Sequence, residues 1–288
     1  MNGILVMNKE KGYTSHDVVA KVRKILNIKK VGHTGTLDPN ATGVLPLLIG
    51  KGTQLSKYLI EHDKIYKATI KLGKTTDTLD CEGKFIEKRN IYRDLLSKEN
   101  VEDVLKSFLG KQTQIPPIYS AIKVNGKKLY EYARSGQDVE IKPRNIEIYD
   151  IVLDDIREDE IDFTVHVSKG TYIRTLCSDI AKKLNTVGYM KELQRIKVGI
   201  FNIDKSITID EMQDLSIAQI ENKIISIEDF FANKKKIILD NKQLNMFLNG
   251  VKLKFEKEND IYKIYDKNNS FIGTGVLEKN FLKRDIIM

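Results

Sequence analysis

Apolar and polar residues alternate along two segments of this chain, which is the pattern of half-buried β-strands. Residues 64–73 alternate cleanly, and their apolar face consists of Tyr66, Ala68, Ile70 and Leu72. Residues 161–167 alternate in the same way, and a short apolar run over 4–7 also predicts a strand. We therefore predict strands at these three places, with the ring of Tyr66 pointing inward.

Apolar residues at helical spacing predict three amphipathic helices. The first follows Ser15, which we expect to cap it, and its apolar stripe is Val18, Val19, Val22, Ile25 and Leu26. The second covers residues 97–109. The third begins shortly after the strand at 161–167, so Arg174 is expected in its first turn.

Strands outnumber helices in this pattern and do not alternate with them regularly. The Asn125–Gly126 pair lies between two short strand-like segments and is typical of a hairpin turn. A parallel sheet with crossover helices would need regular alternation of strands and helices. We therefore predict an α+β fold in which helices flank a mixed, largely antiparallel sheet.

The composition changes after Phe231, where the sequence continues as ANKKK. Beyond this point short strands are predicted at 237–239, 251–255, 261–265 and 271–277. A unit of only about fifty residues is marginally stable alone, so we expect it to pack against the rest of the chain. We predict two domains, 1–232 and 233–288, of which the second is small and β-rich.

The composition is that of a globular protein, with 41% hydrophobic and 31% charged residues among 288. No apolar run approaches the roughly 20 residues that a membrane span needs, and the N-terminus does not resemble a secretory signal. We therefore expect a cytoplasmic protein that does not enter a membrane. Two cysteines without CxxC spacing and four scattered histidines argue against a metal site.

The net charge of +8 and the pI near 9.1 are compatible with a polyanionic partner, because Lys and Arg contact phosphates irrespective of sequence. Lys, Ile and Asn are frequent throughout the chain, and this bias raises the pI without any binding role. Basic clusters at 21–30, 234–236 and 279–284 are more informative than the total, although each could be a solvated face.

One loop, VGHTGTLDPNATGVLP at 31–46, combines a carboxylate with turn-forming residues. Pro39 biases Asp38 toward an extended backbone, and the surrounding glycines allow sharp turns or close approach to a ligand. Such a loop can present the carboxylate of Asp38 rigidly for catalysis. The alternative is a surface turn in which Asp38 bonds its own backbone. His33, in the same loop, could be a general base, a base-stacking platform or a turn residue.

Arg174 is unusual at the start of a helix, because the helix dipole disfavours a cation there unless a distant carboxylate pairs with it. The alternative is an exposed arginine paired with Asp179. Tyr66, taken alone, is better explained as an ordinary core aromatic. His166 lies on the polar face of its predicted strand and is interpreted as a surface residue.

The segment 114–137 interleaves tyrosines with basic residues, namely Tyr119, Tyr130 and Tyr132 with Lys123, Lys127, Lys128 and Arg134. Aromatic rings stack on unpaired bases while neighbouring cations hold phosphates, so this composition suits RNA. The alternative is a hairpin and helix whose tyrosines are merely half-buried.

Five motifs together resemble the bacterial tRNA pseudouridine synthase B (TruB) family, in family order over residues 1–201. They are GHTGTLDPNATGVLP at 32–46, DKIYKATIKLG at 63–73, PPIYSAIKVNGKKLYEYAR at 116–134, SKGTYIRTLCSDI at 168–180 and ELQRIKVGIF at 192–201. The C-terminal module looks similar to the family's small PUA-type RNA-binding domain, on strand pattern and length. One departure is Lys9-Glu10, where the family commonly has Lys-Pro.

The resemblance implies an isomerase that converts uridine 55 of the tRNA T loop to pseudouridine by base flipping, without metal or cofactor. It implies the T stem-loop as partner, no required protein partner, and a monomer. Asp38 would be the catalytic carboxylate, Arg174 its bidentate partner and Tyr66 the aromatic against the target base. The resemblance assigns a catalytic role to no carboxylate other than Asp38. Residues expected to contact RNA are His33, Tyr172, Leu193, Lys123, Tyr130 and Arg134.

Other functions remain open at the level of sequence. A non-catalytic RNA-binding or ribosome-assembly protein would share the basic charge and the tyrosines, but would not need a buried Asp–Arg pair. A glycosidase usually needs two carboxylates and a nuclease a metal cluster, and neither constellation is evident. A synthase acting on another RNA also fits, and the sequence does not decide whether Asp38 attacks C1′, attacks C6 or removes a ribose proton.

Overall fold

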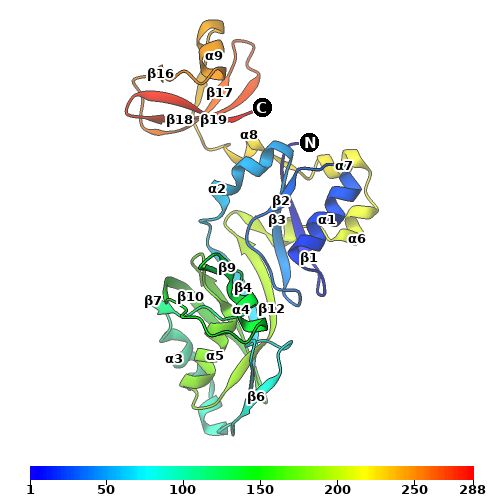
Figure 1. Cartoon of the computed structure of the whole chain (residues 1–288), viewed down its shortest axis with the longest axis vertical. Helices are drawn as coiled ribbons and strands as arrows, with labels where there is room; N and C mark the ends of the chain where they lie inside the picture. The colour runs from blue at the N-terminus through cyan, green and yellow to red at the C-terminus, as the bar shows by residue number, and fades with distance from the viewer.

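The computed structural model describes all 288 residues and contains two main β-sheets. The molecule is elongated, with the C-terminal sheet at one end and the β6 hairpin at the other (Figure 1). The larger sheet has the order β14-β1-β3-β12-β4-β11-β10-β7, with β2 added to β3 and β13 to β12. Its strands are β1 (Gly3–Lys9), β2 (Val31–His33), β3 (Thr42–Ile49), β4 (Lys64–Leu72), β7 (Gly110–Gln114), β10 (Arg144–Arg157), β11 (Glu160–Val167), β12 (Gly188–Val198), β13 (Phe201–Asn202) and β14 (Ile225–Ser226).

The pairing in this sheet confirms the predicted mixed, largely antiparallel fold. Only the contact between β3 and β12 is parallel, and it joins the two halves of the sheet. The two segments predicted from alternation, β4 and β11, pair with each other along their length, with Tyr66 opposite Val165. The long strand β12 was not predicted, because bulges after Met190 and Arg195 interrupt its alternation.

Nine α-helices cover the sheets or project from them. They are α1 (Ser15–Leu26), α2 (Ser56–Leu59), α3 (Lys98–Lys106), α4 (Leu129–Arg134), α5 (Ile173–Lys183), α6 (Ile209–Gln213), α7 (Ile217–Glu221), α8 (Ile227–Phe230) and α9 (Asn241–Leu248). Short 3₁₀ turns lie at Gly50–Leu55, Arg93–Leu96 and Ile203–Lys205. None of these helices is long and apolar enough to cross a membrane.

The cap of α1 differs from the sequence prediction. Thr14 rather than Ser15 is the N-cap, because its hydroxyl accepts a hydrogen bond from the Asp17 N–H while the Asp17 carboxylate accepts from the Thr14 N–H. Ser15 is buried instead and exchanges hydrogen bonds with the backbone of Leu37. The start of α1 therefore anchors the loop that carries Asp38.

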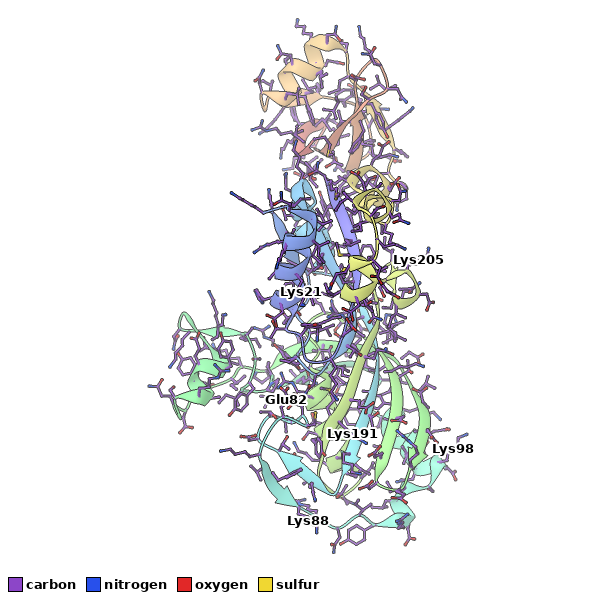
Figure 2. All side chains as sticks on the ribbon, turned by 90° about the vertical axis from the view of Figure 1, so that its right-hand side faces the viewer. Lys21, Glu82, Lys88, Lys98, Lys191 and Lys205 are labelled. Carbon is purple, nitrogen blue, oxygen red and sulfur yellow. The ribbon has the colours of Figure 1, made fainter.

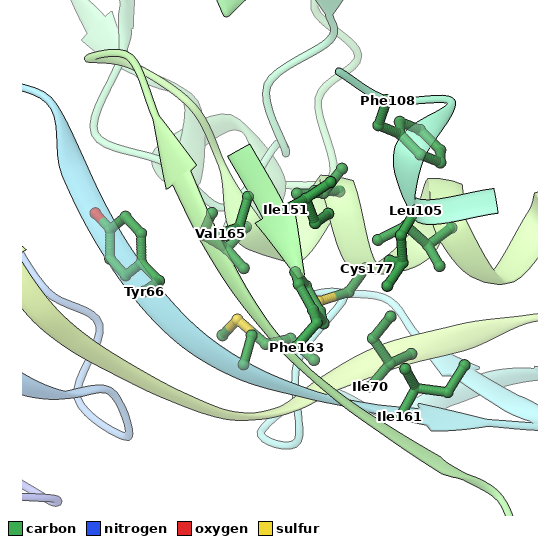
Figure 3. Packing of buried hydrophobic residues seen from close by; sticks show 14 of the residues in the cluster. Tyr66, Ile70, Leu105, Phe108, Ile151, Ile161, Phe163, Val165 and Cys177 are labelled. Carbon is green, nitrogen blue, oxygen red and sulfur yellow. The ribbon is translucent and has the colours of Figure 1, made fainter. Parts of the chain in front are cut away.

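The apolar core of the β4–β11–β10 half lies between the sheet and the helices α3 and α5. Figure 3 shows Phe163, Cys177 and Ile161 packed in this core, with Tyr66 apart from them at its edge. The other half of the sheet buries its apolar residues against α1 and α6. The position of Tyr66 at the end of the core leaves one side of its ring available to a neighbouring cavity.

The C-terminal sheet has the order β15-β17-β18-β19-β16 and its own apolar core beneath α9. Its strands are β15 (Lys236–Ile238), β16 (Leu253–Lys254), β17 (Asp260–Tyr265), β18 (Phe271–Glu278) and β19 (Phe281–Ile287). Ile286 packs with Phe231 in a core shared with the larger sheet. Two hairpins stand apart, β5 (Lys74–Thr76) with β6 (Phe85–Lys88) and β8 (Lys123–Val124) with β9 (Lys127–Lys128). The second confirms the predicted Asn125–Gly126 turn.

Candidate active site

The loop between β2 and β3 is held in place on both sides of Asp38. Lys9 Nζ donates to the backbone carbonyls of Pro39 at 2.9 Å, Tyr13 at 2.6 Å and Glu10 at 3.0 Å. Gly12 N–H also donates to the Pro39 carbonyl. No backbone N–H donates to the Asp38 carboxylate, which excludes the self-bonded surface turn that the sequence left open. The loop instead presents this carboxylate to the interior of the site.

Arg174 lies in the first turn of α5, as predicted, and is only 6% exposed. Its Nε lies 3.1 Å from Asp38 Oδ2, while Nη1 lies 3.4 Å from Asp80 Oδ2. Nη1 and Nη2 also donate to the carbonyls of Thr78 and Tyr119. The expected bidentate pairing with Asp38 is therefore wrong, because the rest of the guanidinium is shared among three other acceptors. The alternative of an exposed arginine is also wrong.

Asp80 is the carboxylate that sequence reasoning missed. It follows β5 in the turn of the β5–β6 hairpin, and its Oδ1 accepts hydrogen bonds from the Thr78 hydroxyl and the Glu82 N–H. A polar hairpin turn ordinarily faces water, so nothing in its local pattern indicates burial. The one available signal was closeness in sequence, because this turn follows β5, which begins two residues after the end of β4, the strand that carries Tyr66. The expectation of a single carboxylate beside Arg174 is thus corrected.

Burial raises the pKa of the Asp38 carboxyl above its ordinary value of 3.8. The positive charge of Arg174 opposes this shift, whereas the negative charge of Asp80 adds to it, and Lys9 lowers the pKa again. Arg174 thus lets a carboxylate persist in a hollow that would otherwise favour its neutral form. A partly desolvated carboxylate of this kind is suited to act as a nucleophile or a base.

A cavity of about 750 Å³ opens beside this pair. Six of the predicted residues line it: Asp38, Tyr66, Arg174, Tyr172, Leu193 and Tyr130. Asp38 is the only carboxylate in the lining, and the cations are Lys64, Arg144, Lys169, Arg174 and Arg195. The cavity is large enough for a nucleotide, and its charge suits a polyanion.

The other three predicted residues lie outside the cavity lining. His33 packs edge-on against His16, with ring centroids 5.2 Å apart, and burial together with the charge of His16 lowers its pKa. Lys123 is in β8, and Arg134 is at the end of α4 with its guanidinium 5.5 Å from the ring of Tyr130. Figure 2 shows the green segment that contains β8, β9 and α4 projecting sideways from the body.

His166, on the polar face of β11, makes contacts that the sequence did not predict. His166 pairs with Asp63 and lies 4.9 Å from the ring of Tyr149, so it is more than the plain surface residue expected from sequence. Burial raises the pKa of Asp63, whereas the hydrogen bond with His166 lowers it, and the net effect is a lowered pKa.

No group of three His, Cys, Asp or Glu side chains anywhere in the chain is arranged to hold a metal ion.

The sequence matches two family descriptions over adjoining segments. Residues 23–173 match the TruB family pseudouridylate synthase N-terminal domain, and residues 174–231 match the tRNA pseudouridylate synthase B C-terminal domain. Among similar curated proteins is tRNA pseudouridine synthase B of Clostridium kluyveri, 43% identical over 98% of this chain and 97% of that protein. The protein of the same name from Caldanaerobacter subterraneus subsp. tengcongensis is 45% identical over 96% of each chain.

The fold is also similar to solved structures. A chain from the crystal structure of a Cbf5-Nop10-Gar1 complex aligns over 99% of this chain and 83% of its own length, with a TM-score of 0.68 and 26% identity. A chain from an H/ACA RNP bound to a substrate RNA containing 2′-deoxyuridine has the same TM-score at 23% identity, which shows a common fold. Together with the two family matches, these similarities mean that the chain belongs to the TruB family of tRNA pseudouridine synthases.

Proposed function

We propose that this protein converts uridine 55 in the T loop of tRNA to pseudouridine, without a metal or cofactor. The observation that carries the proposal is the Asp38 carboxylate, held by Arg174 at the wall of a nucleotide-sized cavity that contains no other carboxylate. A glycosidase of the usual kind would place two carboxylates around the scissile bond, and this lining has one. The surrounding cations favour an RNA substrate over a neutral sugar.

The reaction rearranges bonds within one nucleotide. The N1–C1′ bond breaks, the base turns, C5 bonds to C1′, and the proton on C5 is lost while N1 gains one, so there is no net oxidation or reduction. Asp38 supplies the anionic oxygen, either as a nucleophile or as a base, and Arg174 keeps it ionised. The ring of Tyr66, in the cavity lining, supports the flipped base, and its hydroxyl assists removal of the C5 proton.

The surrounding residues would bind the flipped nucleotide and the rest of the T stem-loop. Tyr172 and Leu193 form part of the wall of the cavity. His33, outside that lining, would help to displace or stack bases as the target nucleotide flips out. Tyr130 offers a face for stacking, with Arg134 and Lys128 held over its ring. Lys123 would contact phosphate. We further propose that residues 1–232 form the catalytic domain and 233–288 a PUA-like RNA-binding domain, in a cytoplasmic monomer that needs no protein partner.

A position-resolved assay tests this function. Purified protein is incubated with tRNA transcripts, and pseudouridine is mapped before and after incubation. The proposal expects modification at uridine 55 alone, and a transcript with cytidine at that position is the control. Tight RNA binding without any pseudouridine would support the non-catalytic RNA-binding alternative, and modification only at another site would refute the choice of target.

A further inference from the structure

A pair of cations occupies a part of the cavity that the chemistry of Asp38 does not use. Arg195, in β12, is 1% exposed, yet its only protein partners are backbone carbonyls. Nε donates to Val44 and Nη2 to Gly35, both at 2.8 Å, and Nη1 donates to no protein group. Lys64, in β4, likewise donates only to the carbonyl of His62. Neither the buried Arg195 nor the half-buried Lys64 forms an ion pair with a carboxylate, although a buried cation ordinarily needs one.

Strand register places these two cations beside the residue proposed to support the base. Arg195 is directly opposite Tyr66 in the antiparallel β4–β12 pair, so the two side chains share one face of the sheet. Lys64 precedes Tyr66 by two residues in β4 and therefore points to the same face. A nucleotide whose base contacts Tyr66 thus has its backbone within reach of both cations.

The loop opposite the cations leaves room for a ligand. Gly35 has φ +77°, and a Cβ at this position would lie 3.3 Å from Arg195 Nη1 and 3.8 Å from the Cε of Lys64. The absence of a side chain keeps the space next to both cations open. Thr34, the preceding residue, is 4% exposed and lines the same cavity, yet its hydroxyl has no hydrogen-bond partner. This hydroxyl is a donor without an acceptor.

The electrostatics of the pair also favour an anion. Burial lowers the pKa of Lys64 to about 8, and the charge of Arg195 is the next cause of this shift. The negative charges of Asp63 and Glu61 offset this shift only in part. Two neighbouring cations repel each other in a site partly shielded from water, and a bound anion would relieve that repulsion. Lys169, which lines the same cavity, differs because it already pairs with Glu61.

We infer that Arg195, Lys64 and Thr34 form a phosphate subsite, which binds one of the two phosphates that flank the target nucleotide and thereby fixes the base against Tyr66 and Asp38. This inference rests on the proposed function, because it assigns one part of the substrate to one part of that site. Arg195 has a double role in it. The same guanidinium that binds phosphate also ties the two ends of the catalytic loop, at Gly35 and Val44.

The test removes charge from the RNA and from the protein in turn. T stem-loop RNAs carry a single neutral methylphosphonate linkage, either 5′ or 3′ of the target uridine, and their dissociation constants are measured with wild type and with Lys64→Gln. We expect one of the two linkages to weaken binding to wild type about tenfold. For Lys64→Gln, we expect binding of the unmodified RNA to weaken by a similar factor. The methylphosphonate should then raise the dissociation constant of this variant by less than about threefold more.

Two further variants make the result specific. Lys67→Gln removes the same charge from the same strand, but Lys67 points to the opposite face and lines a separate hollow of about 580 Å³. It should respond to the methylphosphonate as wild type does. Lys64→Arg restores the charge and should restore the sensitivity. Thermal melting of each variant checks its folding.

The subsite is refuted if neither methylphosphonate linkage weakens RNA binding to wild type. It is also refuted if the linkage weakens binding to Lys64→Gln as much as it weakens binding to wild type. Turnover of the unmodified RNA by wild type, followed by tritium release from C5-labelled uridine, separates the two claims. If wild type turns over the RNA but neither methylphosphonate linkage changes binding, the proposed function stands and the subsite is refuted. A linkage effect without any turnover supports the subsite and refutes the proposed function.

Discussion

At the scale of single residues, Arg174 joins two carboxylates. It contacts Asp38 through Nε and Asp80 through Nη1. The charge of Arg174 lowers the pKa of Asp38, whereas burial and the negative charge of Asp80 raise it. Asp80 therefore fixes the guanidinium but also opposes ionisation of the neighbouring acid. The site combines good positioning of Arg174 with a carboxyl that is harder to ionise.

This arrangement predicts how activity depends on pH. In the proposed reaction Asp38 acts in its ionised form, so turnover should fall as the pH drops through its pKa, at a pH above the ordinary value of 3.8. Asp80→Asn removes a negative charge and therefore lowers the pKa of Asp38. The fall in turnover on the acid side of the pH–rate profile (the acid limb) should then shift to lower pH. Single-turnover rates across the acid range measure the shift.

The matched control is Asp77→Asn. Asp77 lies in the same hairpin turn but accepts its hydrogen bond from Lys84 N–H rather than from Arg174. Its acid limb should coincide with that of wild type. A limb for Asp80→Asn that is unchanged or moves to higher pH would contradict the assigned electrostatics.

Asp38, Arg174 and Tyr66 each have a local signal in the sequence, namely a Pro-Gly loop, a cation at a helix start, and strict alternation. These signals left structural alternatives open, and the predicted roles came from the family resemblance. Asp80 had no such signal, because its burial depends on Arg174, which is distant along the chain. Arg195 was missed for a related reason. It occupies an inward strand position that the pattern reserves for apolar residues, next to a bulge that breaks the alternation.

At the scale of elements, the loop at 34–41 that carries Asp38 depends on contacts with its neighbours. Ser15 holds Leu37, Arg195 holds Gly35, and Lys9 holds Pro39. Lys9 is almost wholly buried, and burial lowers its pKa to about 8. Without it, the carbonyls of Glu10 and Tyr13 would lose this donor, and the carbonyl of Pro39 would keep only the Gly12 N–H.

Lys9→Met should therefore destabilise the fold. The three carbonyls lose a charged donor, which lowers the free energy of unfolding, whereas removal of a buried cation offsets part of this loss. We expect a net loss of about 2 kcal/mol in the free energy of unfolding. Urea unfolding at neutral pH measures this change. Lys11→Met, at an exposed position two residues later, is the control and should lie within about 0.5 kcal/mol of wild type. An equally stable Lys9→Met would show that these contacts do not hold the loop.

At the scale of the whole molecule, the C-terminal sheet is attached to the larger one by a polar contact as well as by apolar packing. The Asp285 carboxylate accepts hydrogen bonds from the hydroxyls of Tyr58 at 2.5 Å and Thr274 at 3.0 Å, and pairs with Lys57. Burial and the Asp285 carboxylate raise the pKa of Tyr58. Because Tyr58 and Lys57 belong to α2, which leads into β4, the attachment is close in sequence to the cavity.

The second β-rich unit is predictable from the composition break after Phe231 and the short strand patterns that follow it. The same pattern does not predict α9 or β19. The strand β19 carries Lys283, Arg284 and Asp285 in a row. Asp285 points inward because Tyr58 and Lys57 of the other unit, together with Thr274, contact its carboxylate. Contacts between distant units are set by three-dimensional packing, which local periodicity does not describe.

Removal of residues 233–288 should weaken binding of full-length tRNA about tenfold or more while leaving the T stem-loop as a substrate, because the cavity lining lies entirely before residue 233. Binding and single-turnover assays on both RNAs measure the two effects, with circular dichroism as a check of folding. Unchanged affinity of the truncated protein for full-length tRNA would refute an RNA-binding role for this unit.

The proposed function assigns the isomerisation to the Asp38 carboxylate. The most direct measurement compares wild type and Asp38→Asn for turnover of T stem-loop RNA and for binding of the same RNA. We expect a loss of at least about a thousandfold in turnover, with affinity changed by less than about threefold, because the amide keeps the shape but not the charge. Turnover of Asp38→Asn within tenfold of wild type would contradict it.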